Sequence, residues 1–105
     1  MTAKFKVLVE RHHVRLDLSL FGDFDGSSAY TLLNVIVKNI VRYNNIVINT
    51  NGLKCVQDYG VQVFAANLKR VTQRHKPPSI TGRFKERFQQ EGAMDFSMPG
   101  LDLNR

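Results

Sequence analysis

The chain has 105 residues, of which 43% are hydrophobic and 23% charged, and this size and balance are typical of a single globular domain. Two domains would each be too small to bury a stable core. No apolar run reaches the roughly 18 residues of a membrane-spanning helix, and the single cysteine, Cys55, excludes an intrachain disulfide. Residues 1–10 alternate like a strand and lack the apolar block of a signal peptide. We therefore expect a cytoplasmic protein with no membrane insertion.

The net charge is +6, and the basic residues concentrate in the second half of the chain. Residues 69–87 contain seven Lys and Arg against one acid, Glu86. A basic surface attracts nucleic acid or an acidic partner, and Phe84 and Phe88 within the stretch add the aromatic component of many nucleic-acid sites. Because these two phenylalanines stand one helical turn apart, we interpret them as a core-facing pair.

The first predicted elements are two strands joined by a hairpin. Residues 4–11 and 14–20 alternate apolar and polar side chains, which indicates two strands that each have one covered face. His12 and His13 lie between them, where the turn is expected. Adjacent histidines on an extended chain point in opposite directions, and no Cys or carboxylate stands at metal-ligand spacing with them. We therefore expect no metal site.

A long helix is expected next. Residues 22–28 have turn composition, and Asp25 or Ser27 suits the N-cap of the helix that follows. A capping turn also explains Asp23 and Asp25 more readily than an acid–base pair does. The helix is expected to span about five turns and to end at Asn44-Asn45. Its predicted buried face consists of Ala29, Leu32, Leu33, Ile36, Val37 and Ile40.

The second half alternates short strands with helices. In chain order the patterns predict a strand over 46–48, a loop over 49–52, a helix over about 58–73, a strand over 79–81, a helix over 83–90 that stops at Gly92, and a C-terminal tail over 94–105. Such alternation implies right-handed crossovers and a largely parallel sheet. We therefore expect one α/β domain over residues 1–93, with a mixed central sheet of about four to five strands and helices packed on it.

The chain holds no recognisable catalytic pattern. No nucleotide-binding glycine motif is present, and no Ser, His and Asp constellation emerges from the sequence. Cys55 has no neighbouring histidine to activate it, and we expect it to be a small buried hydrophobic residue. The sequence therefore predicts no enzymatic activity and no cofactor.

One segment carries a family resemblance. Residues 46–64, IVINTNGLKCVQDYGVQVF, resemble without a gap the signature of STAS domains: an apolar strand, an Asp, a short loop, and Asp-Ser-Ser/Thr-Gly-Leu opening a helix. Gly22-Asp23-Phe24-Asp25 with Ala29 looks like the family's Gly-x-Leu-Asp turn and helix start. The family's last core strand and following helix correspond to Ile80, Gly82, Phe84, Phe88 and Gly92. The resemblance covers about residues 4–96 and implies a STAS-like fold of the anti-sigma factor antagonist type.

This resemblance implies a regulatory protein–protein interaction module. In anti-sigma factor antagonists, the serine opening the second helix is phosphorylated by a kinase that is also the anti-sigma factor, and the unphosphorylated form binds that kinase. The implied partner is thus an anti-sigma factor or a serine kinase-like protein. The phosphoacceptor position holds Asp58, and the implied partner-binding residues are Lys54, Gln57, Asp58 and Tyr59.

The chain departs from the family at this position. No Ser or Thr stands between Cys55 and Val71, so we expect the phosphoserine switch to be absent. Asp58 has two interpretations, a fixed negative charge resembling the phosphorylated state or a replacement helix N-cap. Two other functions stay open: a STAS subunit of a larger complex such as a transporter, and a basic nucleic-acid-binding domain. The sequence predicts no particular oligomeric state.

Overall fold

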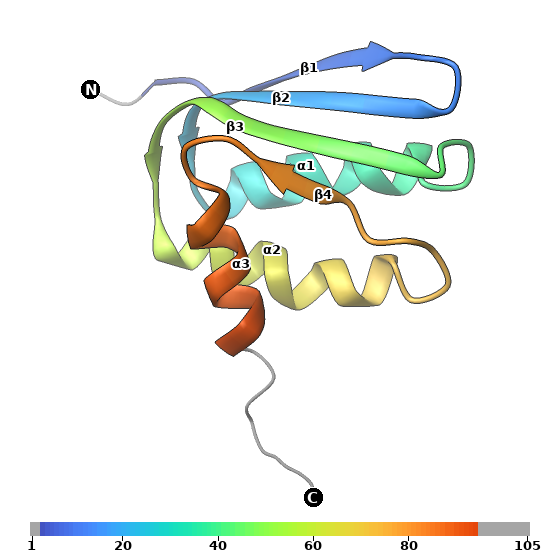
Figure 1. The fold of residues 1–105 in the computed structure, drawn as a ribbon. Helices are drawn as coiled ribbons and strands as arrows, with labels where there is room; N and C mark the ends of the chain where they lie inside the picture. The colour runs from blue at the N-terminus through green and yellow to red at the C-terminus, as the bar shows by residue number, and fades with distance from the viewer. Residues whose placement is uncertain (1–2, 95–105) are drawn as a thin grey trace, which may run out of the picture.

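A computed structural model describes residues 3–94 of the chain. Its elements in chain order are β1 (Lys6–Arg11), β2 (Arg15–Phe24), α1 (Gly26–Asn39), β3 (Asn45–Val56), α2 (Asp58–Val71), β4 (Ser79–Thr81) and α3 (Lys85–Met94). The strands form one four-stranded sheet in the order β1-β2-β3-β4 (Figure 1). β1 is antiparallel to β2, whereas β2, β3 and β4 are parallel. The predicted α/β fold with a mixed sheet is confirmed.

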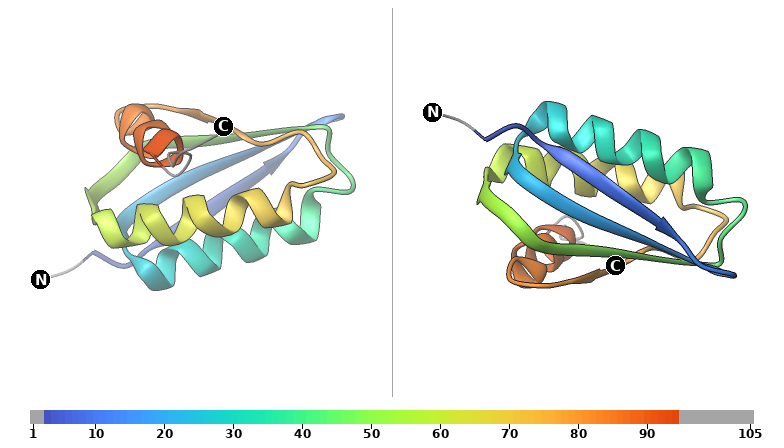
Figure 2. Two further views of the ribbon diagram at one scale, coloured as in Figure 1. Left: turned by 90° about the horizontal axis from the view of Figure 1, so that it is seen from below. Right: turned by 90° about the horizontal axis from the view of Figure 1, so that it is seen from above.

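The helices lie on one side of the sheet. α1 and α2 run side by side beneath it, and α3 packs against α2 near the edge formed by β4 (Figures 1 and 2). Seen from above, the opposite face of the sheet is not covered by any described helix (Figure 2). This arrangement explains the alternation in β2, where Leu16, Leu18 and Leu20 are fully buried and the intervening residues 15, 17 and 19 are more exposed.

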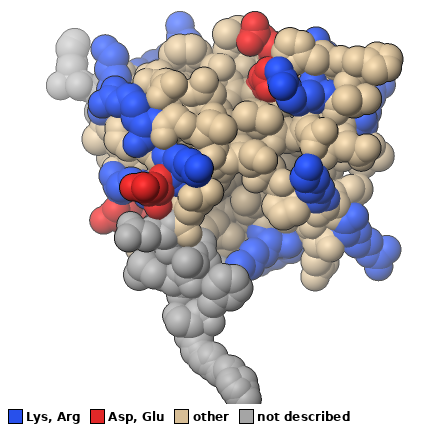
Figure 3. All heavy atoms as spheres, viewed as in Figure 1, with Lys and Arg blue, Asp and Glu red and all other residues tan. Residues whose placement is uncertain are grey.

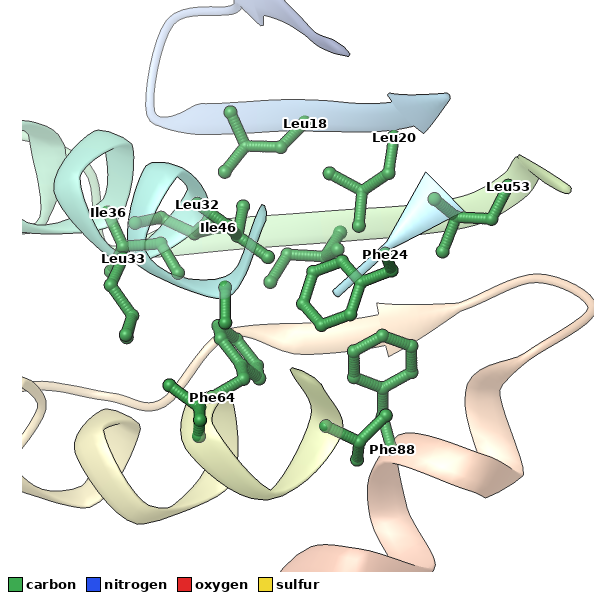
Figure 4. Packing of buried hydrophobic residues seen from close by; sticks show 14 of the residues in the cluster. Leu18, Leu20, Phe24, Leu32, Leu33, Ile36, Ile46, Leu53, Phe64 and Phe88 are labelled. Carbon is green, nitrogen blue, oxygen red and sulfur yellow. The ribbon is translucent and has the colours of Figure 1, made fainter. Parts of the chain in front are cut away.

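The core fills the space between the sheet and the helices. Large side chains from β2 and β3 meet side chains from all three helices there (Figure 4). Phe24, Phe64 and Phe88 form edge-to-face pairs, with ring centroids 5.1 to 6.2 Å apart. Each such pair contributes about 0.5–1.5 kcal/mol beyond the burial of its area. The cluster therefore fastens α2 and α3 to the end of β2.

Two segments predicted as loop or turn belong to strands. Residues 49–52 lie within β3, and Gly22 and Asp23 lie within β2. The pairing of β2 with β3 contains two register shifts in this region, and Gly22 has a φ of 88°. The turn-forming residues therefore bend the paired strands as bulges and do not end them.

The helix boundaries also differ from the prediction. α1 has 14 residues and ends before the predicted Asn44-Asn45, and α2 ends at Val71. α3 continues past Gly92 to Met94, so the predicted stop is wrong. The rest of the predicted tail, residues 95–105, lies outside the described residues.

The predicted buried face of α1 is confirmed except at Val37. Ala29, Leu32 and Ile36 are fully buried, but Val37 is 48% exposed. Val37 lies about 80–100° around the helix from the centre of this face, because successive residues advance by 100°. Its environment therefore depends on what packs beside α1, which helical periodicity does not specify.

Candidate functional site

The predicted site residues lie where β3 passes into α2. Gln57 is the N-cap residue of α2, with extended backbone (φ −89°, ψ 137°), and its side chain makes no capping hydrogen bond. Its backbone N–H donates to the Phe24 carbonyl oxygen at 2.9 Å, which ties the start of α2 to the end of β2. Asp58 is the first helical residue and not the cap. The interpretation of Asp58 as a replacement N-cap is therefore wrong.

The Asp58 carboxylate is bound by a residue of α3. The Arg87 Nη2 donates to Asp58 Oδ1 at 2.5 Å. The side chains of Arg87 and Asp58 are 39% and 72% exposed, and an ion pair this accessible to water contributes only about 0–1 kcal/mol to stability. The fixed negative charge at the start of α2 therefore has an internal counter-ion that a competing group can replace at small cost.

Arg87 is the site residue that the sequence analysis missed. It lies 29 residues from Asp58 in the chain, and no local pattern links the two. The adjacent Phe88 is 4% exposed and packs against Phe24 and Phe64, which holds this turn of α3 beside α2. The core-facing interpretation of Phe84 and Phe88 is confirmed, because Phe84 also packs against the core. The one-turn spacing of Phe84 and Phe88 was therefore the sequence signal that this segment packs against the core.

The start of α2 sits directly on the turn between β2 and α1. Gly60 is buried, and a Cβ atom there would lie 2.7 Å from the backbone carbon and oxygen of Asp25. Tyr59 is 67% exposed, and its ring lies over Gly26, where an added Cβ would be 2.8 Å from Tyr59 Cε2. The two turns therefore form one continuous surface.

Asp25 is the N-cap of α1, which confirms one of the two predicted alternatives. Its carboxylate accepts hydrogen bonds from the Ser28 backbone N–H at 2.9 Å and from the Ser27 and Ser28 hydroxyls at 2.9 and 3.0 Å. The backbone hydrogen bond from Ser28 lowers the pKa of Asp25 most, and the hydroxyls lower it further. Asp23 accepts separately from the Ala3 N–H at 3.0 Å. The capping-turn interpretation is therefore confirmed for Asp25, whereas the Asp23 carboxylate holds the chain before β1, 20 residues away.

Lys54 and Cys55 are exposed near the end of β3. The prediction that Cys55 is buried is wrong. Cys55 pairs with Asp23, and the next pair, Phe24 with Val56, faces the core. Because successive side chains of a strand point to opposite faces, Cys55 points away from the helices. Lys54 lies three residues before Gln57, at the end of β3 that leads into α2.

A separate hollow lies on the open face of the sheet. Its volume is about 260 Å³, and it is lined by Glu10, Arg15, Asp17, Ser19, Val47, Asn49 and Thr81. The predicted site residues do not line it. Asp17 in this hollow pairs with Arg15 at 3.1 Å and with His12 at 3.0 Å. Within residues 3–94 no group of three or more His, Cys, Asp or Glu could hold a metal ion.

Comparisons with known proteins identify the fold. No protein-family model matches the chain, and no curated protein matches it by sequence. An anti-sigma factor antagonist from Mycobacterium paratuberculosis is similar in structure, with a TM-score of 0.64 and 18% identity over 92% of this chain and 85% of that one. The anti-sigma factor antagonist SpoIIAA in its unphosphorylated form gives a TM-score of 0.58 and 12% identity over 95% and 89%.

The chain therefore has the fold of the anti-sigma factor antagonists, and the predicted STAS-like architecture is confirmed. At these identities the similarity concerns the fold. In the described part of the chain, no helix has the length and apolar character needed to cross a membrane.

Proposed function

We propose that this chain is a non-enzymatic, cytoplasmic regulatory module that binds a protein partner at the start of α2, in the manner of an anti-sigma factor antagonist. The observation that carries the proposal is Asp58, 72% exposed in the first turn of α2 in this fold. Lys54, Gln57 and Tyr59 are exposed around it and supply the rest of the docking surface. The proposed partner is an anti-sigma factor or a serine kinase-like protein.

In this proposal, Asp58 replaces a switch with a permanent charge. The first turn of a helix stabilises negative charge through its free N–H groups and its dipole, and a phosphate there would add about two charges. Asp58 supplies one negative charge permanently, and Arg87 pairs with it. A partner that binds here must therefore pair with Asp58 itself or with the Arg87 that it releases.

The alternative functions have less support. The basic stretch would bind nucleic acid most effectively if its phenylalanines were free to stack on bases. Phe88 is 4% exposed and packed in the core, and Phe84 packs against the core beneath Arg83, 5.2 Å from the ring centroid. No observation in residues 3–94 favours a transporter subunit over an independent module.

Calorimetric titration of the partner that co-purifies from the native host tests the role of Asp58. Asp58→Ser should change the affinity at least tenfold, about 1.4 kcal/mol, with little change in melting temperature. The affinity falls if the partner offers Lys or Arg and rises if it is acidic. Glu86→Gln is the matched control, because it removes an exposed first-turn acid from α3. Equal affinities of the wild type and Asp58→Ser would contradict the proposal.

Mass spectrometry tests the absence of the switch. After incubation with a kinase that acts on STAS domains, we expect no phosphate within residues 49–64. The one Ser or Thr in this segment, Thr50, is fully buried, and its hydroxyl donates to the Thr81 carbonyl oxygen. Phosphate on the exposed Tyr59 would contradict the proposal that the start of α2 carries no switch.

A further inference from the structure

α1 and α2 carry exposed apolar side chains outside the buried face that packs against the sheet. Along α1 and just past its end, Tyr30, Val37 and Val41 are 56%, 48% and 80% exposed. Their spacing of seven and four residues places them on one side of the helix. Tyr59 of α2 extends this line, because its ring covers Gly26, one turn before Tyr30. We call Tyr59, Tyr30, Val37 and Val41 the outer apolar strip.

Exposed residues of α2 follow the same spacing of seven and four residues. Ala66 and Arg70 follow Tyr59 at seven and eleven residues, and both are exposed. The buried flank of α2 that faces α1 includes Gly60, which contacts the turn before α1. The two lines of exposed residues therefore run in the same direction along neighbouring helices. From Gly26 to Val41 the strip extends about 20 Å, at about 1.5 Å per helical residue, which matches some four turns of another helix.

The charges near the C-terminal end of α1 have one sign, whereas Asp25 and Asp58 lie at the opposite end of the strip. α1 contains no acidic residue, and Lys38 and Arg42 are exposed at its end. The one acid of α2, Asp58, is engaged by Arg87 of α3. Arg70 of α2 is exposed as well, and Figure 3, which views the molecule from the side of β4 and α3, shows Lys and Arg at the lower right with no Asp or Glu among them. A second copy of this chain would bring like charges together, whereas an acidic partner would find complementary ones.

We infer that the outer surface of α1 and α2 binds an acidic amphipathic helix of a partner protein. Exposed apolar side chains on one side of a helix mark interaction sites, here with the exposed Asn34 between Tyr30 and Val37, and an amphipathic helix binds such a surface with its apolar face. The apolar side chains of the bound helix contact the outer apolar strip, and its acids reach Lys38, Arg42 and Arg70. This surface goes beyond the proposed Asp58 site and shares only Tyr59 with it.

Three synthetic peptides test the inference. The first is a helix of about 18 residues, roughly 27 Å long, with Leu on one face and Glu on both flanks. The second replaces each Glu by Lys, and the third scrambles the first so that it has no apolar face. Titration into the isotope-labelled full chain should shift the amide signals of Tyr30, Val37 and Val41 with the Glu peptide. The other two peptides should bind at least tenfold more weakly.

Four variants locate the interaction. Val37→Glu should weaken the Glu peptide at least tenfold, and Leu8→Glu should not, although Leu8 is similarly exposed, at 51%, on the open face of the sheet. Arg70→Glu should weaken the Glu peptide and strengthen the Lys peptide. Asp58→Ser should not weaken the Glu peptide, because it removes an acid and leaves the outer apolar strip in place. The proposed function expects the same variant to change the affinity for the native partner at least tenfold, so failure of this inference and failure of the proposed function give different results.

The inference is overturned by equal binding of the Glu and Lys peptides, by shifts confined to the open face of the sheet, or by an unchanged affinity in Val37→Glu. Self-association of the wild type that Val37→Glu abolishes would assign the surface to a second copy and also overturn it. If the protein binds phosphatidylglycerol vesicles and Val37→Glu abolishes that binding, the surface binds a membrane and the inference is overturned. Melting curves of the variants confirm that each one is folded.

Discussion

Replacing Gly60 by alanine should destabilise the protein, although alanine favours helices. In an exposed helix interior, Gly→Ala stabilises by about 1 kcal/mol. At Gly60 the new Cβ would lie 2.7 Å from the backbone carbon and oxygen of Asp25 and 2.9 Å from its Cα. Backbone atoms cannot rotate away as a side chain can, so the start of α2 must separate from the turn that precedes α1. Overpacking of this kind costs about 1–3 kcal/mol.

Because the two effects oppose each other, the expected net loss for Gly60→Ala is about 0–2 kcal/mol. This corresponds to a fall in melting temperature of up to roughly 16 °C for a domain of this size, measurable by calorimetry. The loss should also weaken partner binding, because Gly60 positions Asp58 and Tyr59.

Gly26→Ala is the matched control. Its Cβ would meet Tyr59 Cε2 at 2.8 Å, the far end of a side chain that is 67% exposed and free to move aside. We expect its melting temperature to stay within a few degrees of the wild type. A Gly60→Ala protein clearly more stable than the wild type would refute the close approach of α2 to the turn before α1.

Leu33→Ala should cost about 2–5 kcal/mol in urea denaturation, because Leu33 is 6% exposed. Val37→Ala should cost less than about 1 kcal/mol, and equal costs would contradict the assignment of Val37 to the surface. A double-mutant cycle with Asp58→Ala and Arg87→Ala should give a coupling of about 0–1 kcal/mol that shrinks at high salt, and a larger, salt-independent value would contradict an exposed pair. Hydrogen bonds lower the pKa of Asp25 in the folded state, so its stabilisation is present above its unfolded pKa of about 3.8 and is lost as the pH falls through the folded value. The unfolding free energy of the wild type should therefore fall more steeply below pH 4 than that of Asp25→Asn, and parallel curves would contradict this role.

The sequence by itself was sufficient for the order of the elements and for most of the core. The alternation in β1 and β2 and the apolar stripe of α1 report directly which side chains face a covered side, because side-chain direction repeats with a fixed period in each element. Asp25 was one of two predicted caps, since capping is a local interaction between a side chain and the next turn of backbone. The same local rules failed where β3 continues through residues 49–52, because pairing with β2 holds turn-forming residues in an extended conformation.

The tertiary structure alone decided the composition of the site. Neither the pairing of Asp58 with Arg87 nor the assignment of the α2 cap to Gln57 has a local signature. Arg87 reaches Asp58 because Phe88 is held in the core by Phe24 and Phe64, which come from other elements. The exposure of Val37 was undetermined for a similar reason, because a residue at the edge of a helical face is buried or exposed according to what packs beside it. Contacts between segments distant in sequence depend on the assembled core, and periodicity carries information only about the element in which it occurs.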